Sequence, residues 1–207
     1  MQELGISFDE KLHHFETEDN FELFRAFSPT GKVPCLVDGE TVVWDSLAIV
    51  EYLAEQHSEV WPADKAARTW ARCAAAEMHS GFSALRNICP MNCAVTVEMF
   101  GISDELQRDI ERVDELWCEG LDRFGGPFLA GDRFTAVDAF FCPVAFRIRS
   151  YQLPVVEKAQ AYCERLLGLE SMVAWDAAGV GESWIEQAHE DEIREAGKVI
   201  HDRRESD

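Results

Sequence analysis

Apolar residues recur along the chain with two different spacings, and the change from one to the other falls near residue 60. Before that point, short runs rich in β-branched and aromatic residues predict strands at residues 8–15, 33–37 and 41–44. The last two runs flank Asp38-Gly39-Glu40, and an Asp-Gly pair between two such runs is a strong hairpin signal. Residues 45–55 then predict a helix that starts at polar side chains. We expect this part of the chain to be a small α/β unit.

Beyond residue 63 the apolar spacing is that of amphipathic helices. One set with steps of three and four predicts a long helix, with apolar residues at 67, 71, 74, 78, 82 and 85. A second set predicts another helix that can pack beside the first, with apolar residues at 106, 110, 113, 117, 121 and 124. Further helices are expected near residues 135–150, 155–167 and 182–198. The pattern predicts an α/β domain at 1–62 followed by an all-helical domain at 63–207.

Composition and charge narrow the possible classes of function. The 207 residues are 47% hydrophobic and 28% charged, as in an ordinary globular protein, and no apolar run approaches the ~20 residues of a membrane span. No signal peptide is visible at the N-terminus, which predicts a cytoplasmic protein. With 39 acidic and 19 basic residues, the net charge of −20 argues against nucleic acid and against a membrane surface as partners. Part of the acidity lies in residues 182–207, which we expect to form a solvated helix with a frayed end.

The seven cysteines are scattered, and no pair has the C-x-x-C spacing. An odd number of thiols in such a chain is typical of a reduced protein whose cysteines are mostly small core residues. Cys89 and Cys93 have no other ligand pair near them in sequence, so no metal site is predicted. Cys35 stands at the head of a predicted strand and leaves thiol–disulfide exchange as one alternative function.

The residues best suited to binding chemistry fall in two short segments. Pro34 stands at the head of a predicted strand, where a cis bond would turn the backbone N–H and C=O of Val33 toward an extended, peptide-like ligand. Asp45 and Ser46 open the following helix, whose free N–H groups and serine hydroxyl form a carboxylate site, while Asp45 can pair with an amine. Each residue also has a purely structural interpretation: Pro34 as a turn, Ser46 as a helix cap and Lys32 as a solvated charge.

The order of these residues resembles a known family. The segment Ser28-Pro29-Thr30-Gly31-Lys32-Val33-Pro34-Cys35-Leu36, followed by Asp45-Ser46-Leu47-Ala48-Ile49-Val50-Glu51-Tyr52-Leu53, resembles the glutathione-binding segment of the cytosolic glutathione S-transferases. Gly131-Asp132-Arg133-Phe134-Thr135-Ala136-Val137-Asp138-Ala139 resembles the capping box of that family's C-terminal domain, in which Thr135 and Asp138 cap each other's backbone N–H groups. Ala76-Glu77-Met78-His79-Ser80-Gly81-Phe82 resembles a bacterial branch of the family.

The resemblance implies a thioredoxin-like α/β domain, here N-terminally truncated, followed by an all-α helical-bundle domain, and it suggests a homodimer. It also implies that glutathione is a substrate. Val33 would pair its backbone with the cysteinyl unit beside a cis Pro34, and Asp45 and Ser46 would hold the γ-glutamyl end. Lys32 would reach toward the glycyl carboxylate.

Two further residues are candidates for the pocket of a second substrate, a small electrophile. His79 and Arg86 lie seven residues apart on the predicted long helix and are therefore expected on one face. A polar edge of the helix pair is the alternative interpretation of both residues.

The catalytic residue stays unknown. In the family a Ser, Tyr or Cys follows the first strand, whereas residues 1–6 resemble the end of the first helix. We therefore expect the sequence to start at an internal Met, and the alternative is a relative that has lost these first elements. Ser7, Ser28 and Tyr52 do not occupy the matching position. Two functions follow: transfer of the glutathione thiol to an electrophile by the complete form, or a non-catalytic glutathione-binding or interaction module.

Overall fold

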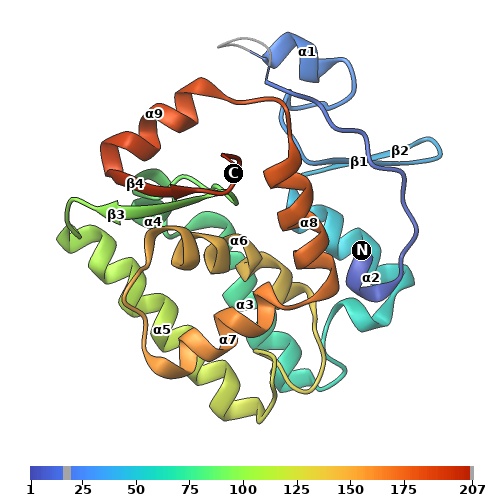
Figure 1. Cartoon of the computed structure of the whole chain (residues 1–207). Coiled ribbons are helices and arrows are strands. Elements are labelled where there is room, and N and C mark those ends of the chain that lie inside the picture. Colours follow the sequence, from blue (N-terminus) through green and yellow to red (C-terminus); the bar gives the residue numbers. More distant parts are fainter. Residues whose placement is uncertain (16–19, 206–207) are drawn as a thin grey trace.

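The computed structural model of the chain describes residues 1–15 and 20–205. Within them, the strands form two separate antiparallel pairs, β1–β2 and β3–β4, on opposite sides of the molecule (Figure 1). The elements follow the chain in the order η1 (Gln2–Leu4, a 3₁₀ helix), α1 (Phe21–Arg25), β1 (Cys35–Asp38), β2 (Thr41–Trp44), α2 (Ser46–Gln56), η2 (Ser58–Val60, 3₁₀), α3 (Lys65–Ser80), α4 (Ser83–Ile88), β3 (Val95–Met99), α5 (Asp104–Phe124), α6 (Ala136–Tyr151), α7 (Glu157–Leu167), α8 (Glu170–Gly181), α9 (Gln187–Ala196) and β4 (Gly197–Asp202).

The predicted hairpin and the helix after it are confirmed. β1 pairs with β2 from Cys35↔Trp44 to Asp38↔Thr41, and Gly39 in the turn has a φ of 59°. Glycine suits this left-handed conformation because it has no Cβ. No residue of β1, β2 or α2 is fully buried. The hairpin therefore contributes little to the core and presents its loops to solvent.

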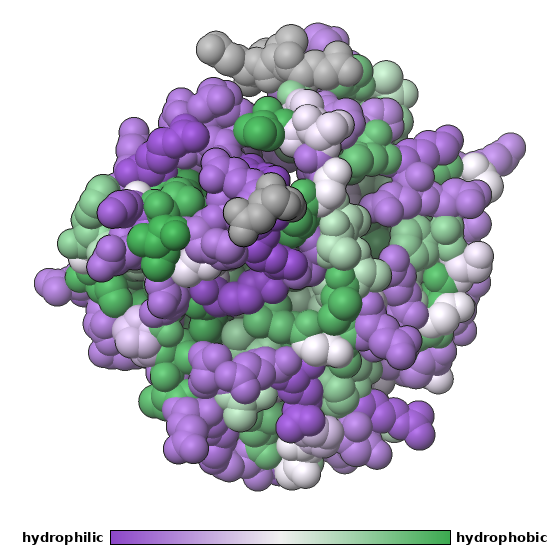
Figure 2. Space-filling view, viewed as in Figure 1, coloured by the Kyte–Doolittle hydropathy of each residue, from purple (hydrophilic) through white to green (hydrophobic). Residues whose placement is uncertain are grey.

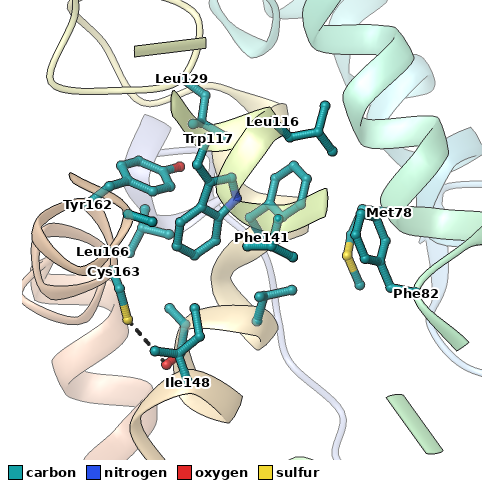
Figure 3. Packing of buried hydrophobic residues seen from close by; sticks show 14 of the residues in the cluster. Met78, Phe82, Leu116, Trp117, Leu129, Phe141, Ile148, Tyr162, Cys163 and Leu166 are labelled. Carbon is teal, nitrogen blue, oxygen red and sulfur yellow. Dashed lines mark hydrogen bonds between the residues drawn. The ribbon is translucent and has the colours of Figure 1, made fainter. Parts of the chain in front are cut away.

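The core lies among helices α3, α5, α6 and α7. Trp117 of α5 is fully buried between Tyr162 of α7 and Phe141 of α6, with ring centroids 4.8 and 5.8 Å away (Figure 3). α3 approaches α5 closely at Gly120, where an added Cβ would lie 2.5 Å from the ring of Trp70. The two predicted apolar stripes are buried as expected, with Ala67, Ala71, Ala74 and Met78 from α3 and Leu106, Ile110, Val113 and Trp117 from α5.

The long helix predicted through residue 85 ends at Ser80. Gly81 is extended (φ −113°, ψ −159°) and Phe82 has a left-handed backbone (φ 55°, ψ 39°), after which α4 begins. The apolar spacing continues across this break because Phe82 remains buried. The expectation that His79 and Arg86 share one helix face is therefore wrong, since they belong to α3 and α4.

The acidic C-terminal segment also differs from expectation. α9 buries Ile193 and nearly all of Glu190, and β4 pairs with β3 from Val95↔Asp202 to Met99↔Gly197. The predicted solvated helix is present as α9, most of whose side chains are exposed. The predicted frayed end is wrong as far as residue 205, because β4 follows the helix, and residues 206–207 lie outside the described part. The second half of the chain is thus helical apart from one small sheet.

Two other predictions need correction. Residues 8–15 form no strand, because no other described segment pairs with them and a strand exists only through such pairing. α8 was not predicted, since its sequence has apolar residues on several sides and only Met172 is buried. Both errors arise where tertiary contacts, rather than local spacing, decide the structure.

Hydrophilic side chains cover most of the face seen in Figure 2, in keeping with the high charge of the chain. None of the helices in the described residues has both the length and the apolar character that crossing a membrane requires. The division of the chain at residue 62 stays a prediction.

Candidate functional site

A buried serine fixes the loop that leads into β1. The hydroxyl of Ser28 donates to the carbonyl of Lys32 at 2.6 Å and lies 3.3 Å from the hydroxyl of Thr30. Gly31 has a φ of 64°, and a Cβ there would lie 2.6 Å from the ring of Phe21. The contacts of Ser28 and the close packing at Gly31 set the backbone path into the next residues.

The Val33–Pro34 peptide bond is cis, as predicted. Val33 is 45% exposed, and neither its N–H nor its C=O has a hydrogen-bond partner among the described residues. An exposed residue with both backbone groups unpaired can receive an extended peptide in the manner of an added strand.

Asp45 joins β2 to α2 in a conformation that residues other than glycine rarely adopt, with φ 72° and ψ 129°. Such a conformation costs about 1–3 kcal/mol and is found preferentially at ligand sites. Its Oδ1 accepts a hydrogen bond from the N–H of Leu47 at 2.9 Å, so Asp45 caps α2. The N–H groups of Ser46 and Ala48 lack acceptors within the helix, and together with the half-buried Ser46 hydroxyl they can bind an anion.

His79 reaches from α3 to the start of α2. Its Nε2 lies 3.2 Å from Oδ2 of Asp45, and its Nδ1 lies 3.4 Å from the hydroxyl of Ser46. The edge of the ring meets Phe140 of α6, with centroids 6.2 Å apart. When neutral with its proton on Nε2, the imidazole accepts from the Ser46 hydroxyl, and when protonated it donates to both neighbours. The structure therefore groups His79 with Asp45 and Ser46.

Arg86 faces a cleft of about 870 Å³ that is lined by α4, α8, α9 and the connecting segments, with residues 10 and 12 at its border. Apolar side chains in its lining include Met91, Trp175 and Trp184. Nη1 of Arg86 donates to the carbonyl of His79 at 3.1 Å, which ties the cleft lining to the C-terminal end of α3. A buried or partly buried cleft with aromatic walls and a few polar groups is the usual form of a small-molecule site.

Arg147 of α6 also lines this cleft, and sequence reasoning missed it. Nothing in the local pattern around it distinguishes it from any other helical arginine. Only the packing of α6 beside α4 and the segment after it brings its side chain to the cleft, where Nε donates to the carbonyl of Cys89 at 2.7 Å.

Lys32 is exposed, and its ammonium makes no ion pair with any described residue. It lies beside Val33 on the same loop and can therefore meet an anionic end of a ligand that pairs with Val33.

The hydroxyls considered from the sequence are engaged elsewhere. The Ser28 hydroxyl is held by the Lys32 carbonyl, and the Tyr52 hydroxyl donates to Asp38 at 2.8 Å. Neither is placed to activate a thiol at the site, and the catalytic residue stays unknown.

All seven cysteines are free. Burial raises the pKa of Cys89 to about 12 and that of Cys93 to about 11, so both stay protonated thiols at neutral pH. The thiol of Cys35 donates to the carbonyl of Phe27 at 3.5 Å. In the part of the chain that the structure describes, no group of three or more His, Cys, Asp or Glu is placed to hold a metal ion.

Comparisons with known proteins identify the same segments. The family model described as "Glutathione S-transferase, N-terminal domain" matches residues 1–56. Glutathione S-transferase 1 of Dianthus caryophyllus is 30% identical over 145 residues, which are 67% of this chain and 65% of that protein. A glutathione transferase homolog from Burkholderia, solved with bound glutathione, has a TM-score of 0.63 and 23% identity over 86% of each chain. The chain belongs to the cytosolic glutathione S-transferase family.

Membership in this family accounts for the fold, a thioredoxin-like α/β segment followed by a helical one. A dichloromethane dehalogenase of Methylophilus leisingeri is 42% identical over 59 residues, or 28% of this chain. The match spans only 22% of the length of that dehalogenase. The residues matched by the family model, 1–56, include the loop before β1 and the start of α2, where the candidate site lies.

Proposed function

We propose that this protein binds glutathione across the Val33–Pro34 loop and the start of α2, and that its complete form transfers the glutathione thiol to a small electrophile. The observation that carries the proposal is the group formed by Asp45, Ser46 and His79 beside the unpaired backbone of Val33.

Each end of glutathione has a matching group on the chain. The cysteinyl unit pairs with the free N–H and C=O of Val33, as an added strand would. The γ-glutamyl carboxylate binds the Ser46 hydroxyl and the first N–H groups of α2, where the helix dipole favours a negative charge. Lys32 meets the glycyl carboxylate. Local dipoles and single cations are needed here, because the net charge of −20 repels an anionic peptide as a whole.

The electrophile occupies the cleft beside Arg86. In the transfer step the sulfur of glutathione forms a bond to the electrophilic carbon, the thiol proton leaves to a base, and the leaving group departs with its electron pair. Binding both reactants side by side lowers the barrier by removing the cost of bringing them together. A homodimer and a cytoplasmic location stay predictions from the family resemblance.

A non-catalytic glutathione-binding module is the second candidate. It is favoured by the hydroxyls of Ser28 and Tyr52, which are both bonded away from the site. The two candidates differ only in whether a bound thiol is activated.

Calorimetric titration with glutathione, followed by a conjugation assay with 1-chloro-2,4-dinitrobenzene, distinguishes them. Saturable binding with turnover above the uncatalysed rate supports the transferase. Saturable binding without turnover supports the module. The absence of any glutathione binding would contradict both.

A further inference from the structure

Two arginines that line the cleft have no acidic partner. Arg86 donates from Nη1 to the carbonyl of His79 at 3.1 Å. Arg147 donates from Nε to the carbonyl of Cys89 at 2.7 Å and from Nη1 to that of Pro143 at 3.3 Å. Neither forms a salt bridge with any described residue. Because a guanidinium carries five N–H donors, each arginine keeps several of them unused.

Among the arginines that line this cleft, Arg204 is paired, whereas Arg86 and Arg147 have no ion pair with a described residue. On the same side of the molecule, Arg149 and Arg203 share the carboxylate of Asp176, and Arg204 pairs with Glu190. Acidic groups are thus available nearby, and yet two cations are left without one.

Arg86 and Arg147 also lie close enough to affect one another. Partial burial lowers the pKa of Arg147, and the positive charge of Arg86 lowers it further. Two like charges that line one cleft, with no described carboxylate in ion-pair contact with either, are stabilised when an anion binds between them.

We propose that Arg86 and Arg147 form the subsite for an anionic group, a carboxylate, on the second substrate. This inference rests on the proposed function for the identity of the reaction, and it adds the class of electrophile. The fork of a guanidinium binds a planar carboxylate through two parallel hydrogen bonds, which also orients the molecule.

The other residues that line the cleft limit which kind of molecule can carry the carboxylate. The chain from residue 182 to 192 contributes acidic side chains to the lining, including Glu182, Glu186 and Glu192. Trp175 and Trp184 contribute aromatic surface. A compound with a single carboxylate and an aromatic or apolar body satisfies both parts of the cleft, whereas a second negative charge would meet the acidic residues.

A binding experiment without glutathione tests the subsite on its own. We would titrate the whole protein with 4-nitrobenzoate and with 4-nitrobenzamide, its uncharged analogue, by calorimetry at low salt. We expect the wild type to bind the carboxylate about tenfold more tightly than the amide, because only the carboxylate forms charge-assisted hydrogen bonds with the two arginines. The preference should fall as salt is added.

Two variants and one control show whether the preference for the carboxylate depends on Arg86 and Arg147. Arg86→Gln should reduce the preference to about one, and Arg147→Lys should reduce it while keeping a positive charge at the partly buried position. Arg133→Gln is the matched control, because Arg133 lines a different cavity and also has no described acidic partner. Circular dichroism shows whether each variant folds, and if Arg147→Lys does not, Arg86→Gln alone decides.

A matched pair of electrophiles, 4-chloro-3,5-dinitrobenzoate and its methyl ester, extends the test to turnover with glutathione. Wild-type kcat/KM should favour the benzoate, and Arg86→Gln should lose this preference. Equal binding of nitrobenzoate and nitrobenzamide by the wild type, or a preference that survives in Arg86→Gln, would overturn the subsite. Failure of glutathione to bind would instead overturn the proposed function and leave the carboxylate measurement standing.

Discussion

Asp45 uses both of its carboxylate oxygens within the protein. Oδ1 accepts from the N–H of Leu47 at 2.9 Å, and Oδ2 faces Nε2 of His79 at 3.2 Å. The other ring nitrogen of His79 faces the Ser46 hydroxyl at 3.4 Å. His79 therefore links Asp45 and Ser46 through its two ring nitrogens and holds both residues at the start of α2.

Replacing His79 with Phe tests this link, because an aromatic ring can keep the contact with Phe140. We expect glutathione affinity to fall about three- to tenfold through loss of the hydrogen bonds to Asp45 and Ser46. Calorimetric titration of the wild type and of the variant with glutathione measures the difference. His57→Phe, a distant and partly exposed histidine, is the control. Equal glutathione affinity of His79→Phe and the wild type would rule out this role of His79.

At the scale of elements, the start of α6 is held by one fully buried carboxylate. Oδ2 of Asp138 accepts from the N–H and the hydroxyl of Thr135 at 2.8 and 3.2 Å. Oδ1 accepts from the N–H of Leu129 at 3.0 Å and from the hydroxyl of Tyr162 at 2.7 Å. The predicted capping box is confirmed. Asp138 also ties α6 to α7 and to the loop before it.

Thr135→Ala and Asp138→Ala should therefore differ in their effects on stability. Loss of the threonine cap should cost about 0.5–2 kcal/mol of unfolding free energy. Loss of Asp138 leaves buried donors on Leu129 and Tyr162 unsatisfied and should cost about 3 kcal/mol or more. The double variant should lose less than the sum, because the two residues share hydrogen bonds. Urea midpoints equal to that of the wild type for both single variants would contradict this account.

The elements with strong local signals could be predicted from the sequence. The hairpin at Gly39, the cap at Thr135 and the cis bond before Pro34 follow from the chemistry of single residues. The break at Gly81 could not, because the burial of Phe82 continues the apolar spacing of one uninterrupted helix. β4 could not be predicted either, since its partner β3 lies about a hundred residues earlier and only the fold brings them together.

At the scale of the whole molecule, Asp176 fastens the C-terminal segment to the helical core. Burial tends to raise the pKa of its carboxyl, but hydrogen bonds from Arg149 and Arg203 outweigh burial and hold that pKa below its usual value. A carboxyl with a lower pKa in the folded protein adds stability above its unfolded pKa. This contribution disappears as the pH falls through the folded pKa.

Asp176→Asn should accordingly lower the free energy of unfolding by about 1–3 kcal/mol at pH 7. The difference from wild type should shrink as the pH is lowered below about 4. Asp122→Asn is the control, because its pair with Lys158 is exposed and should contribute less than about 1 kcal/mol. Urea unfolding at several pH values measures both variants, and a cost of Asp176→Asn that does not change with pH would refute the role of its charge.

The placement of the site also depends on the whole molecule. The sequence could group Val33, Asp45 and Ser46 because they are close in sequence and have distinctive chemistry. It could not group His79 with Asp45 and Ser46, because sequence spacing does not reveal that α3 passes beside the start of α2. Arg147 reaches the cleft only through the packing of α6.

The central claim, that the start of α2 holds the γ-glutamyl end of glutathione, is tested most directly by calorimetric titration of the wild type and of Ser46→Ala with glutathione. The hydroxyl bonded to a charged carboxylate should contribute about 1.5–3 kcal/mol, so the variant should bind about ten- to a hundredfold more weakly. Thr69→Ala, which removes an exposed hydroxyl bonded to the Lys65 carbonyl, should bind like the wild type. Equal affinity of Ser46→Ala and the wild type would contradict the account.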